Sequence, residues 1–278
     1  PAEPLFRSYN ASNSSIIGGK NNNINYNSNY ALIIGGQNND LSYAASNSSI
    51  IGGKNNNLSF GVCYSSIIGG FDNTLFDNSC YSSIIGGQNN IVSCVSNRSS
   101  IIGGTNGTVH YSNRSSIIGG NLNGISGYTN YSSIIGGRCN QIYSNSPLSS
   151  IIGGDSNSLS YSSERSSLIG GYDNKIYCSS SNSSIIGGVN NTLSFYSSNS
   201  SIIGGGTNCL SASTRSVIIG GQNLNLFSED DTVYVPKLKV DDTITVKSGS
   251  TFSQGLTGEY TFGSSNVTIV NGVIVAVS

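Results

Sequence analysis

The chain has 278 residues, of which only 9% are charged, and its 12 basic and 13 acidic side chains leave a net charge of −1. A balance so close to neutral provides no basic field, so we expect no nucleic-acid partner. The longest apolar runs are far shorter than the roughly 18 residues of a membrane-spanning helix, so we expect no membrane insertion.

Residues 1–13, which include Pro1 and Pro4, precede the first copy of a repeated motif. We expect this segment to be an N-terminal cap or linker. The repeat itself occupies residues 14–221, and a region of different composition follows at 222–278.

The repeat region is dominated by Ile-Ile-Gly-Gly, which occurs thirteen times in identical or nearly identical form. Successive copies are 17 residues apart ten times and 16 residues apart twice. A fixed period of this kind is typical of one structural unit stacked on itself. The second isoleucine of each copy is Ile17, Ile34, Ile51, Ile68, Ile85, Ile102, Ile118, Ile135, Ile152, Ile169, Ile186, Ile203 or Ile219.

Each repeat is too short for two packed helices, and its Asn, Gly and Ser residues oppose helix. It suffices for two short strands and two turns, because a strand advances about 3.3 Å per residue. Ser-Ser-Ile-Ile predicts one strand, and the alternating apolar positions that begin seven residues after the second isoleucine predict the other. We therefore predict an all-β fold, a parallel β-roll or β-solenoid of about thirteen 17-residue coils stacked about 4.8 Å apart.

An asparagine stands five residues after the second isoleucine in eleven of the twelve complete repeats, and Gly107 is the exception. Stacking places equivalent residues directly above one another. We therefore expect a structural ladder whose side-chain amides bond from coil to coil. Its members are Asn22, Asn39, Asn56, Asn73, Asn90, Asn123, Asn140, Asn157, Asn174, Asn191 and Asn208.

The doubled isoleucine predicts self-association. Neighbouring residues of a strand point to opposite faces, so one isoleucine of each pair fills the interior while the other faces outward. The outward residues would form a stripe larger than a soluble monomer normally exposes. We expect a homotrimer of parallel chains packed stripe to stripe; the alternative is a thicker coil that buries both isoleucines itself. The expected core and interface residues are Ile16, Ile17, Ile50, Ile51, Ile67, Ile68, Ile84, Ile85, Ile101, Ile102, Ile117, Ile118, Ile134, Ile135, Ile151 and Ile152.

Six cysteines match no metal-binding spacing, and we expect most of them to be reduced. Cys63 and Cys80 occupy the same place in consecutive coils, so a disulfide between them is conceivable but not required.

One turn of the coil carries exposed aromatic and basic residues and is a possible contact surface. Arg98 and Arg114 lie on adjacent coils and would form a small basic spot, although charges that merely prevent edge pairing are the simpler interpretation. Tyrosines at this turn could stack on sugars. The residues of this possible contact surface are Tyr64, Tyr81, Arg98, Arg114, Tyr131 and Arg165.

Residues 222–278 are predicted to be a β-rich C-terminal capping or trimerisation domain. The stretches 232–235 and 243–246 alternate as strands do. Asn271-Gly272 between two valine-rich runs indicates a two-residue hairpin. A solenoid needs such caps for solubility.

The sequence offers little for catalysis, and we expect no enzyme, catalytic residue, cofactor or metal. Glycan-cleaving solenoids need paired carboxylates. Here Asp72 and Asp173 share a repeat position but lie six coils apart. The acidic runs 229–231 and 241–242 could hold a cation, although solvated loop carboxylates are the simpler interpretation.

The repeat Ser-Ser-Ile-Ile-Gly-Gly-x-x-Asn-x-Leu-Ser resembles the head repeat of trimeric autotransporter adhesins, a YadA-like or haemagglutinin-type left-handed parallel β-roll. Similar repeats occur in fibre and spike proteins of phages and other viruses. The resemblance covers about residues 14–221 and implies a trimer in which each chain forms its own roll. This repeat departs from the family in being longer and in placing isoleucine where the family has a small residue.

Three functions follow as hypotheses. The favoured one is a structural, trimeric fibre or spike protein at the virion surface of a virus or phage, which mediates host attachment. Its partners would be its own copies, other virion or tail proteins, and a host surface glycan or protein. The alternative is a bacterial, extracellular trimeric adhesin head that binds host matrix or glycans. A lesser alternative is an ice-binding solenoid, which would favour a flat threonine array. In each attachment hypothesis the turns or the C-terminal domain would carry the contact.

Overall fold

The structure is a computed structural model that describes residues 11–236 and, beyond them, the backbone of 258–262, 265–270 and 273–277. The chain divides into two compact units, Pro1–Pro236 and Lys237–Ser278. The expectations for residues 1–10, 243–246 and 241–242 fall outside the described residues.

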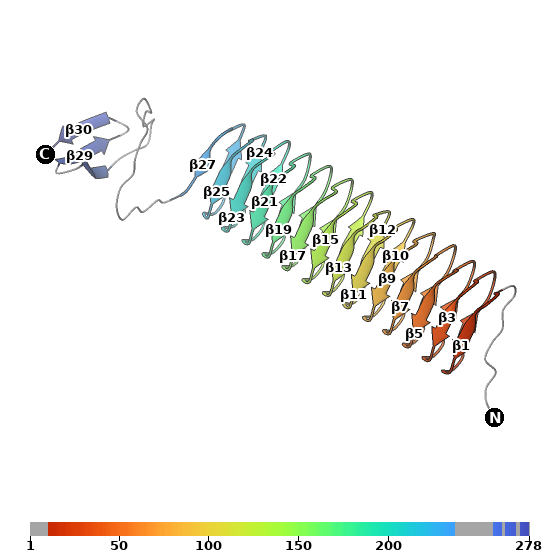
Figure 1. Ribbon diagram of the computed structural model, residues 1–278. Helices are drawn as coiled ribbons and strands as arrows, with labels where there is room; N and C mark the ends of the chain where they lie inside the picture. Colours follow the sequence, from red (N-terminus) through yellow and green to blue (C-terminus); the bar gives the residue numbers. More distant parts are fainter. Residues whose placement is uncertain (1–10, 237–257, 263–264, 271–272, 278) are drawn as a thin grey trace. The chain divides into compact units, whose positions relative to one another are not determined.

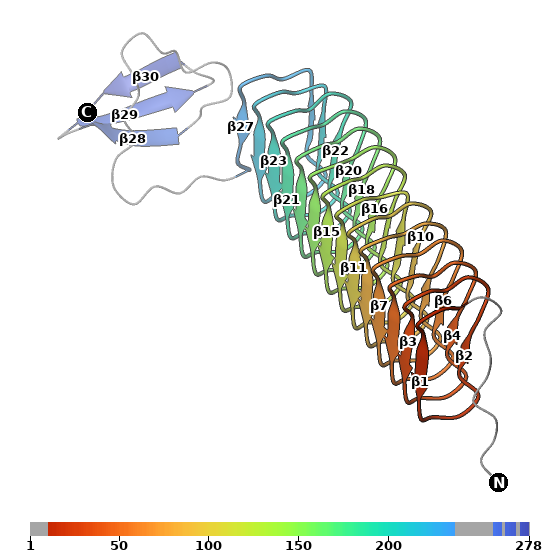
Figure 2. The same ribbon diagram turned by 45° about the vertical axis from the view of Figure 1, so that its right-hand side comes forward.

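The first unit is a parallel β-solenoid, which confirms the predicted fold class (Figure 1). Each coil contributes one strand to each of two parallel sheets, so that odd-numbered strands form one wall and even-numbered strands the other (Figure 2). Isolated parallel bridges after each Gly-Gly pair, from Lys20 with Gln37 to Gly206 with Gln222, add a third line of pairing.

The first sheet contains fourteen strands in the order of the chain. They are β1 (Ser15–Ile17), β3 (Leu32–Ile34), β5 (Ser49–Ile51), β7 (Ser66–Ile68), β9 (Ser83–Ile85), β11 (Ser100–Ile102), β13 (Ser116–Ile118), β15 (Ser133–Ile135), β17 (Ser150–Ile152), β19 (Ser167–Ile169), β21 (Ser184–Ile186), β23 (Ser201–Ile203), β25 (Val217–Ile219) and β27 (Val233–Tyr234).

The second sheet contains thirteen strands. They are β2 (Asn23–Ile24), β4 (Asp40–Leu41), β6 (Asn57–Leu58), β8 (Thr74–Leu75), β10 (Ile91–Ser93), β12 (Thr108–His110), β14 (Gly124–Ser126), β16 (Gln141–Ile142), β18 (Ser158–Leu159), β20 (Lys175–Ile176), β22 (Thr192–Ser194), β24 (Cys209–Ser211) and β26 (Asn225–Phe227).

The coils stack in register, so that each residue of a strand pairs with the same repeat position in the next coil. Ile134 pairs with Ile151 and Ile135 with Ile152, for example. The ladder continues past Gly221, where the repeat motif ends, because β26 pairs with β24 and β27 with β25. Parallel pairing therefore extends to Tyr234.

The second unit contains a three-stranded antiparallel sheet of β28 (Gly258–Phe262), β29 (Ser265–Val270) and β30 (Val273–Val277). The pairing of β29 with β30 matches the hairpin that Asn271-Gly272 predicts between them. The capping and trimerisation roles of residues 222–278 stay predictions.

The interior of the solenoid is apolar on its two walls. From Ile33 onward the first aliphatic residue of each pair, such as Ile134, is buried, and so is the aliphatic residue of the facing strand, such as Ile142. These two columns pack together along the coils as one core cluster. Their burial supplies the hydrophobic stabilisation of each coil.

The turns of the solenoid are filled by buried polar side chains that bond to backbone groups of the next coil. The Asn140 side chain accepts from the Asn157 N–H at 3.0 Å and donates to the Gly153 and Gly154 carbonyls at 3.2 Å. Equivalent asparagines repeat this pattern. Gly107 has no side chain to do so, although its N–H donates to Asn90 Oδ1 at 2.9 Å.

Serines form a second buried ladder at the opposite turn, and the sequence pattern did not indicate this role. The Ser149 hydroxyl accepts from the Ser166 N–H at 3.2 Å and donates to the Ser163 carbonyl at 3.1 Å. Both Ser149 and Ser166 are buried. The first serine of Ser-Ser-Ile-Ile is thus an interior hydrogen-bonding residue, whereas the second begins the strand.

The two glycines of each motif meet different constraints. Gly136 and Gly137 both have positive φ, 67° and 79°. A Cβ on Gly136 would meet no atom within 4 Å, but one on Gly137 would lie 2.3 Å from Asn140 Nδ2 and 2.4 Å from the Gly154 carbonyl oxygen. The first glycine is therefore required by conformation alone, and the second also by the space that the asparagine ladder occupies.

This difference predicts unequal costs for the two alanine substitutions. We expect Gly136→Ala to lower the free energy of unfolding by about 1–2 kcal/mol, the strain of a left-handed residue with a Cβ. Gly137→Ala should cost roughly 3 kcal/mol or more, because it also displaces the Asn140 amide from its backbone partners. Urea unfolding of both variants measures the difference, and equal midpoints would contradict it.

Candidate interaction surfaces

The second isoleucine of each pair forms an exposed column on the outer face of the first sheet. We call these thirteen second isoleucines, from Ile17 to Ile219, the outer isoleucine column. Ile118 and Ile135 are 42% and 43% exposed, and the other members resemble them apart from the terminal Ile17 at 58%. The residue two positions earlier in each strand lies beside them on the same face, and it is a serine except for Leu32 in β3 and Val217 in β25.

The structure separates the predicted core and interface residues into two sets. The first isoleucines, from Ile50 to Ile151, are buried, whereas Ile16 at the start of the solenoid is only partly buried. The second isoleucines are exposed in the single chain. The alternative of one thicker coil that buries both isoleucines is therefore wrong. Each strand has one face toward the interior, which takes the first isoleucine, and one face toward the outside, which takes the second.

The tyrosines and arginines of the possible contact surface project from one turn. Each of the six has a left-handed backbone, with φ between 52° and 60°, which directs the side chain away from the coil. Five of them occupy five consecutive coils, from Tyr64 to Tyr131, and we call these five the tyrosine–arginine row. Leu148 separates Arg165 from this row.

Ring stacking organises the tyrosine–arginine row. The Tyr64 and Tyr81 rings are stacked with centroids 5.0 Å apart and planes 6° apart. The Arg98 guanidinium lies over the Tyr81 ring at 5.8 Å from its centroid, and the Arg114 guanidinium lies over the Tyr131 ring at 5.0 Å. Tyr81 therefore lies between the Tyr64 ring and the Arg98 guanidinium, and Tyr64 and Tyr131 each have one partner, so few ring faces of the row are open for sugar stacking.

Three asparagines line the base of this row, and sequence analysis did not single them out. Asn97, Asn113 and Asn130 each precede a member of the row. Their Oδ1 atoms accept from the backbone N–H of the equivalent residue in the preceding coil at 2.6–2.7 Å. The recurrence of Asn-Arg, Asn-Arg and Asn-Tyr in consecutive coils was the signal that could have identified them.

A shallow groove of about 700 Å³ lies along these coils, lined by both arginines, by Tyr81 and Tyr131, and by the three asparagines. Cys63 and Cys80 lie at its edge and form a disulfide in the structure. The groove therefore brings together most of the tyrosine–arginine row, while Arg165 pairs with Glu164 outside it at 3.3 Å.

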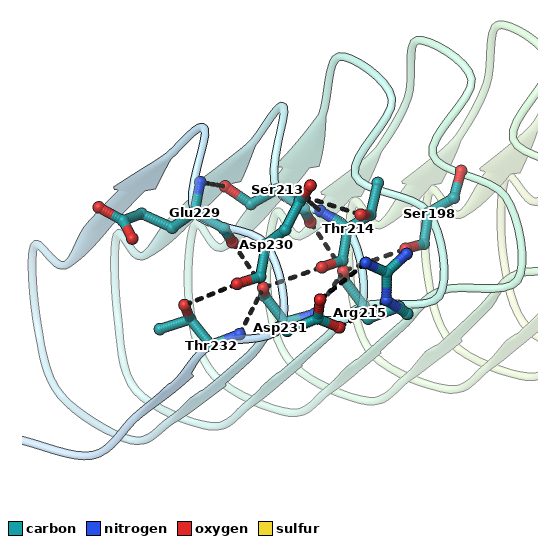
Figure 3. A network of polar contacts seen from close by, with 10 residues as sticks. Ser198, Ser213, Thr214, Arg215, Glu229, Asp230, Asp231 and Thr232 are labelled. Carbon is teal, nitrogen blue, oxygen red and sulfur yellow. Dashed lines mark hydrogen bonds and ion pairs between the residues drawn. The ribbon is translucent and has the colours of Figure 1, made fainter. Parts of the chain in front are cut away.

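The acidic run 229–231 lies in the last turn of the solenoid, between β26 and β27, where it forms a polar network (Figure 3). Asp230 accepts from the N–H and hydroxyl of Thr214 at 2.7 and 2.8 Å, and Asp231 pairs with Arg215. Glu229 donates its N–H to the Ser213 hydroxyl at 3.0 Å. Within the described residues no group of three His, Cys, Asp or Glu side chains is arranged to hold a metal.

These contacts lower the pKa of both aspartates. Hydrogen bonds from Thr214 hold the pKa of Asp230 below its usual value, and the Arg215 hydrogen bond does the same for Asp231. The carboxylates therefore fasten the last coil to the one before it.

Comparison with protein-family models gave no match, and comparison with curated proteins also gave none. The described part of the chain contains no helix long and apolar enough to cross a membrane.

The lowered pKa values predict that acid loosens the last coil. A carboxylate with a depressed folded-state pKa stabilises the fold above its unfolded pKa of about 3.9, and this contribution is lost as the pH falls through the folded value. We expect the Thr214 amide to lose hydrogen-exchange protection below about pH 3.9.

The Ser181 amide is the matched control, because it occupies the same turn but donates to the Ser198 hydroxyl, which does not titrate. The variant Asp230→Asn keeps an acceptor for Thr214 and should remove most of the pH dependence. Equal loss of protection at Thr214 and Ser181 would show that acid acts on the whole solenoid instead.

Proposed function

We propose that this chain is a structural, non-enzymatic protein that assembles as a parallel homotrimer and forms part of a virus or phage fibre or spike that attaches to a host. The β-solenoid fits a structural, fibre-like protein. The assembly is supported above all by the outer isoleucine column.

The outer isoleucine column is a continuous apolar stripe over about 60 Å at 4.8 Å per coil. Stripes of this length mark interaction surfaces in soluble proteins. Full burial of an isoleucine contributes about 1.5–3 kcal/mol, so covering its exposed two-fifths contributes roughly 1 kcal/mol at each coil. Repetition over thirteen coils makes the sum sufficient to offset the entropy of association.

A second copy of the same column is the partner that fits best. A rotation axis parallel to the solenoid places equivalent isoleucines of all chains in one layer, so every coil makes the same contact. The resemblance to trimeric β-roll heads favours three chains. In such a trimer the turns with the tyrosine–arginine row remain available to an external partner.

The location follows from the same hypothesis. As a fibre component the protein would lie at the virion surface, bound to other virion or tail proteins and to a glycan or protein of the host. Trimerisation would multiply weak contacts at the turns through avidity. The alternative location is a bacterial surface, where the same trimer would be an adhesin head.

One observation favours ice binding as a competing function. The outer isoleucine column and the neighbouring column, which is serine except at Leu32 and Val217, form a regular surface with one residue of each column per coil. An ice-binding protein would need this face free, whereas the proposed trimer covers it. A wild-type chain that is monomeric and shows thermal hysteresis would therefore replace our proposal.

We predict that charges in the outer isoleucine column disrupt the trimer. Light scattering should give three chain masses for the wild type and one for Ile118→Asp/Ile135→Asp, because each layer would bury three carboxylates without partners. The control Leu122→Asp/Val189→Asp replaces two apolar residues that are 48% and 46% exposed elsewhere. It should remain trimeric; a monomeric wild type would contradict the assembly.

We further predict that antibodies raised against the solenoid label assembled virus particles in immunogold electron microscopy. Gene neighbours that encode capsid or tail proteins should accompany this result. Labelling of a bacterial envelope, without particle labelling, would favour the adhesin alternative.

A further inference from the structure

The groove described above coincides with one of the two shortened coils. Between Ile102 and Ile118 the chain has 16 residues instead of 17. The preceding coil turns through two consecutive left-handed residues, Cys94 and Val95, whereas the short coil has only Tyr111 there. The short coil thus lacks a counterpart of Val95, which lines the groove.

Two positive charges in this groove lack an acidic partner. Among the five arginines of the described solenoid, Arg138, Arg165 and Arg215 each pair with a carboxylate. Arg98 and Arg114 instead lie over tyrosine rings, and Arg114 Nη1 also donates to the Tyr131 hydroxyl. No acidic side chain lines the groove. Both guanidinium groups therefore keep donors for a ligand and are held in place by the rings, which reduces the entropy lost on binding.

The asparagine amides add oriented donors between the arginines. The Oδ1 atoms of Asn97, Asn113 and Asn130 each accept from a backbone N–H group of the preceding coil at 2.6–2.7 Å. This fixes each amide so that its Nδ2 points away from the backbone. Within the described residues these three Nδ2 groups donate to no protein acceptor.

We propose that this groove, which we call the arginine groove, binds an acidic saccharide through a carboxylate or sulfate group. Arg98 and Arg114 hold the anionic oxygens through charge-assisted hydrogen bonds. The Nδ2 groups of the three asparagines donate to hydroxyl and ring oxygens of the sugar. Val95 and the Cys63–Cys80 disulfide provide the apolar contact that the less polar side of a sugar requires.

Other anionic ligands fit this surface less well. Two arginines on a chain of net charge −1 give too little positive charge for a nucleic-acid backbone. An extended peptide would need free backbone groups. The N–H groups of Arg98 and Arg114 already donate to Cys80 and Asn97 of the preceding coils at 2.9 Å.

This inference rests on the proposed function in one respect, because it places host recognition on the turns of the fibre. The two are nevertheless tested separately. Binding of an oligosaccharide is measured in solution on the full chain, whereas attachment is measured on host cells.

The test is calorimetric titration of the full chain with 3′-sialyllactose, lactose 3′-sulfate and neutral lactose. We expect at least one acidic sugar to bind at least tenfold more tightly than lactose, with affinity that falls as salt rises. Binding of the sialylated sugar alone identifies a carboxylate ligand, and binding of the sulfated sugar alone identifies a sulfate ligand.

The decisive variant is Arg98→Asn/Arg114→Asn. Asparagine occupies this same left-handed turn position as Asn47, Asn182 and Asn199, so the solenoid should tolerate the change. We expect the double variant to lose at least tenfold in affinity for the acidic sugar. The matched control Arg165→Asn alters the same position outside the groove and should bind as the wild type does.

Three results would overturn the inference. They are no binding of either acidic sugar, equal binding by the double variant and the wild type, or equal binding of inorganic sulfate and the sulfated sugar. Light scattering of each variant shows whether the assembly is preserved. Cell attachment that persists in the double variant would remove the groove as the contact but leave attachment standing.

Discussion

In-register stacking of the coils is the constraint on which the rest of the structure depends. Each strand residue of the solenoid pairs with its equivalent in the next coil. A residue type that recurs in every coil must therefore pack against, or hydrogen-bond to, the same position of the neighbouring coil. Isoleucine packs on isoleucine, and asparagine and serine bond to the backbone of the next coil. A charge at such a position would face a like charge along the whole ladder. This explains why charged residues are rare, and why within the described solenoid they lie outside the strands of the two sheets, apart from Asp40 and Lys175 at the starts of β4 and β20.

The small cross-section of the coil explains the large share of buried serine and asparagine. Only two columns of large apolar side chains fit between the walls. The backbone at the turns would otherwise bury N–H and carbonyl groups without partners, which costs about 1–3 kcal/mol for each group. The two polar ladders satisfy these groups and at the same time link neighbouring coils. Hydrogen bonds thus hold neighbouring coils together at the turns, as apolar packing does along the strands.

Much of this arrangement could be predicted because repetition makes the sequence pattern unambiguous. The spacing of the isoleucines gave the coil, and strand alternation gave one inward and one outward residue per pair, as Ile134 and Ile135 show. The buried serines could not be assigned, because Ser149 and Ser150 are identical in sequence but lie on opposite sides of the wall. The partners of Arg98, Arg114 and Arg165 also depended on side-chain directions at left-handed turns, which spacing alone does not determine.

The outer isoleucine column and the arginine groove differ in the partners that they can bind, because the column repeats in every coil and the groove does not. The outer isoleucine column is the same in every coil, so it can form a long contact but cannot distinguish one coil from another. Recognition of a small ligand needs a place where the repetition fails. The short coil before Ile118 is such a place, since it lacks a counterpart of Val95 and carries Arg114 next to Arg98 of the preceding coil. The second short coil, before Ile219, carries Arg215 at the same position, but Asp231 pairs with that arginine. Of the two shortened coils, only the first therefore leaves its arginine without a carboxylate at the equivalent position of the next coil.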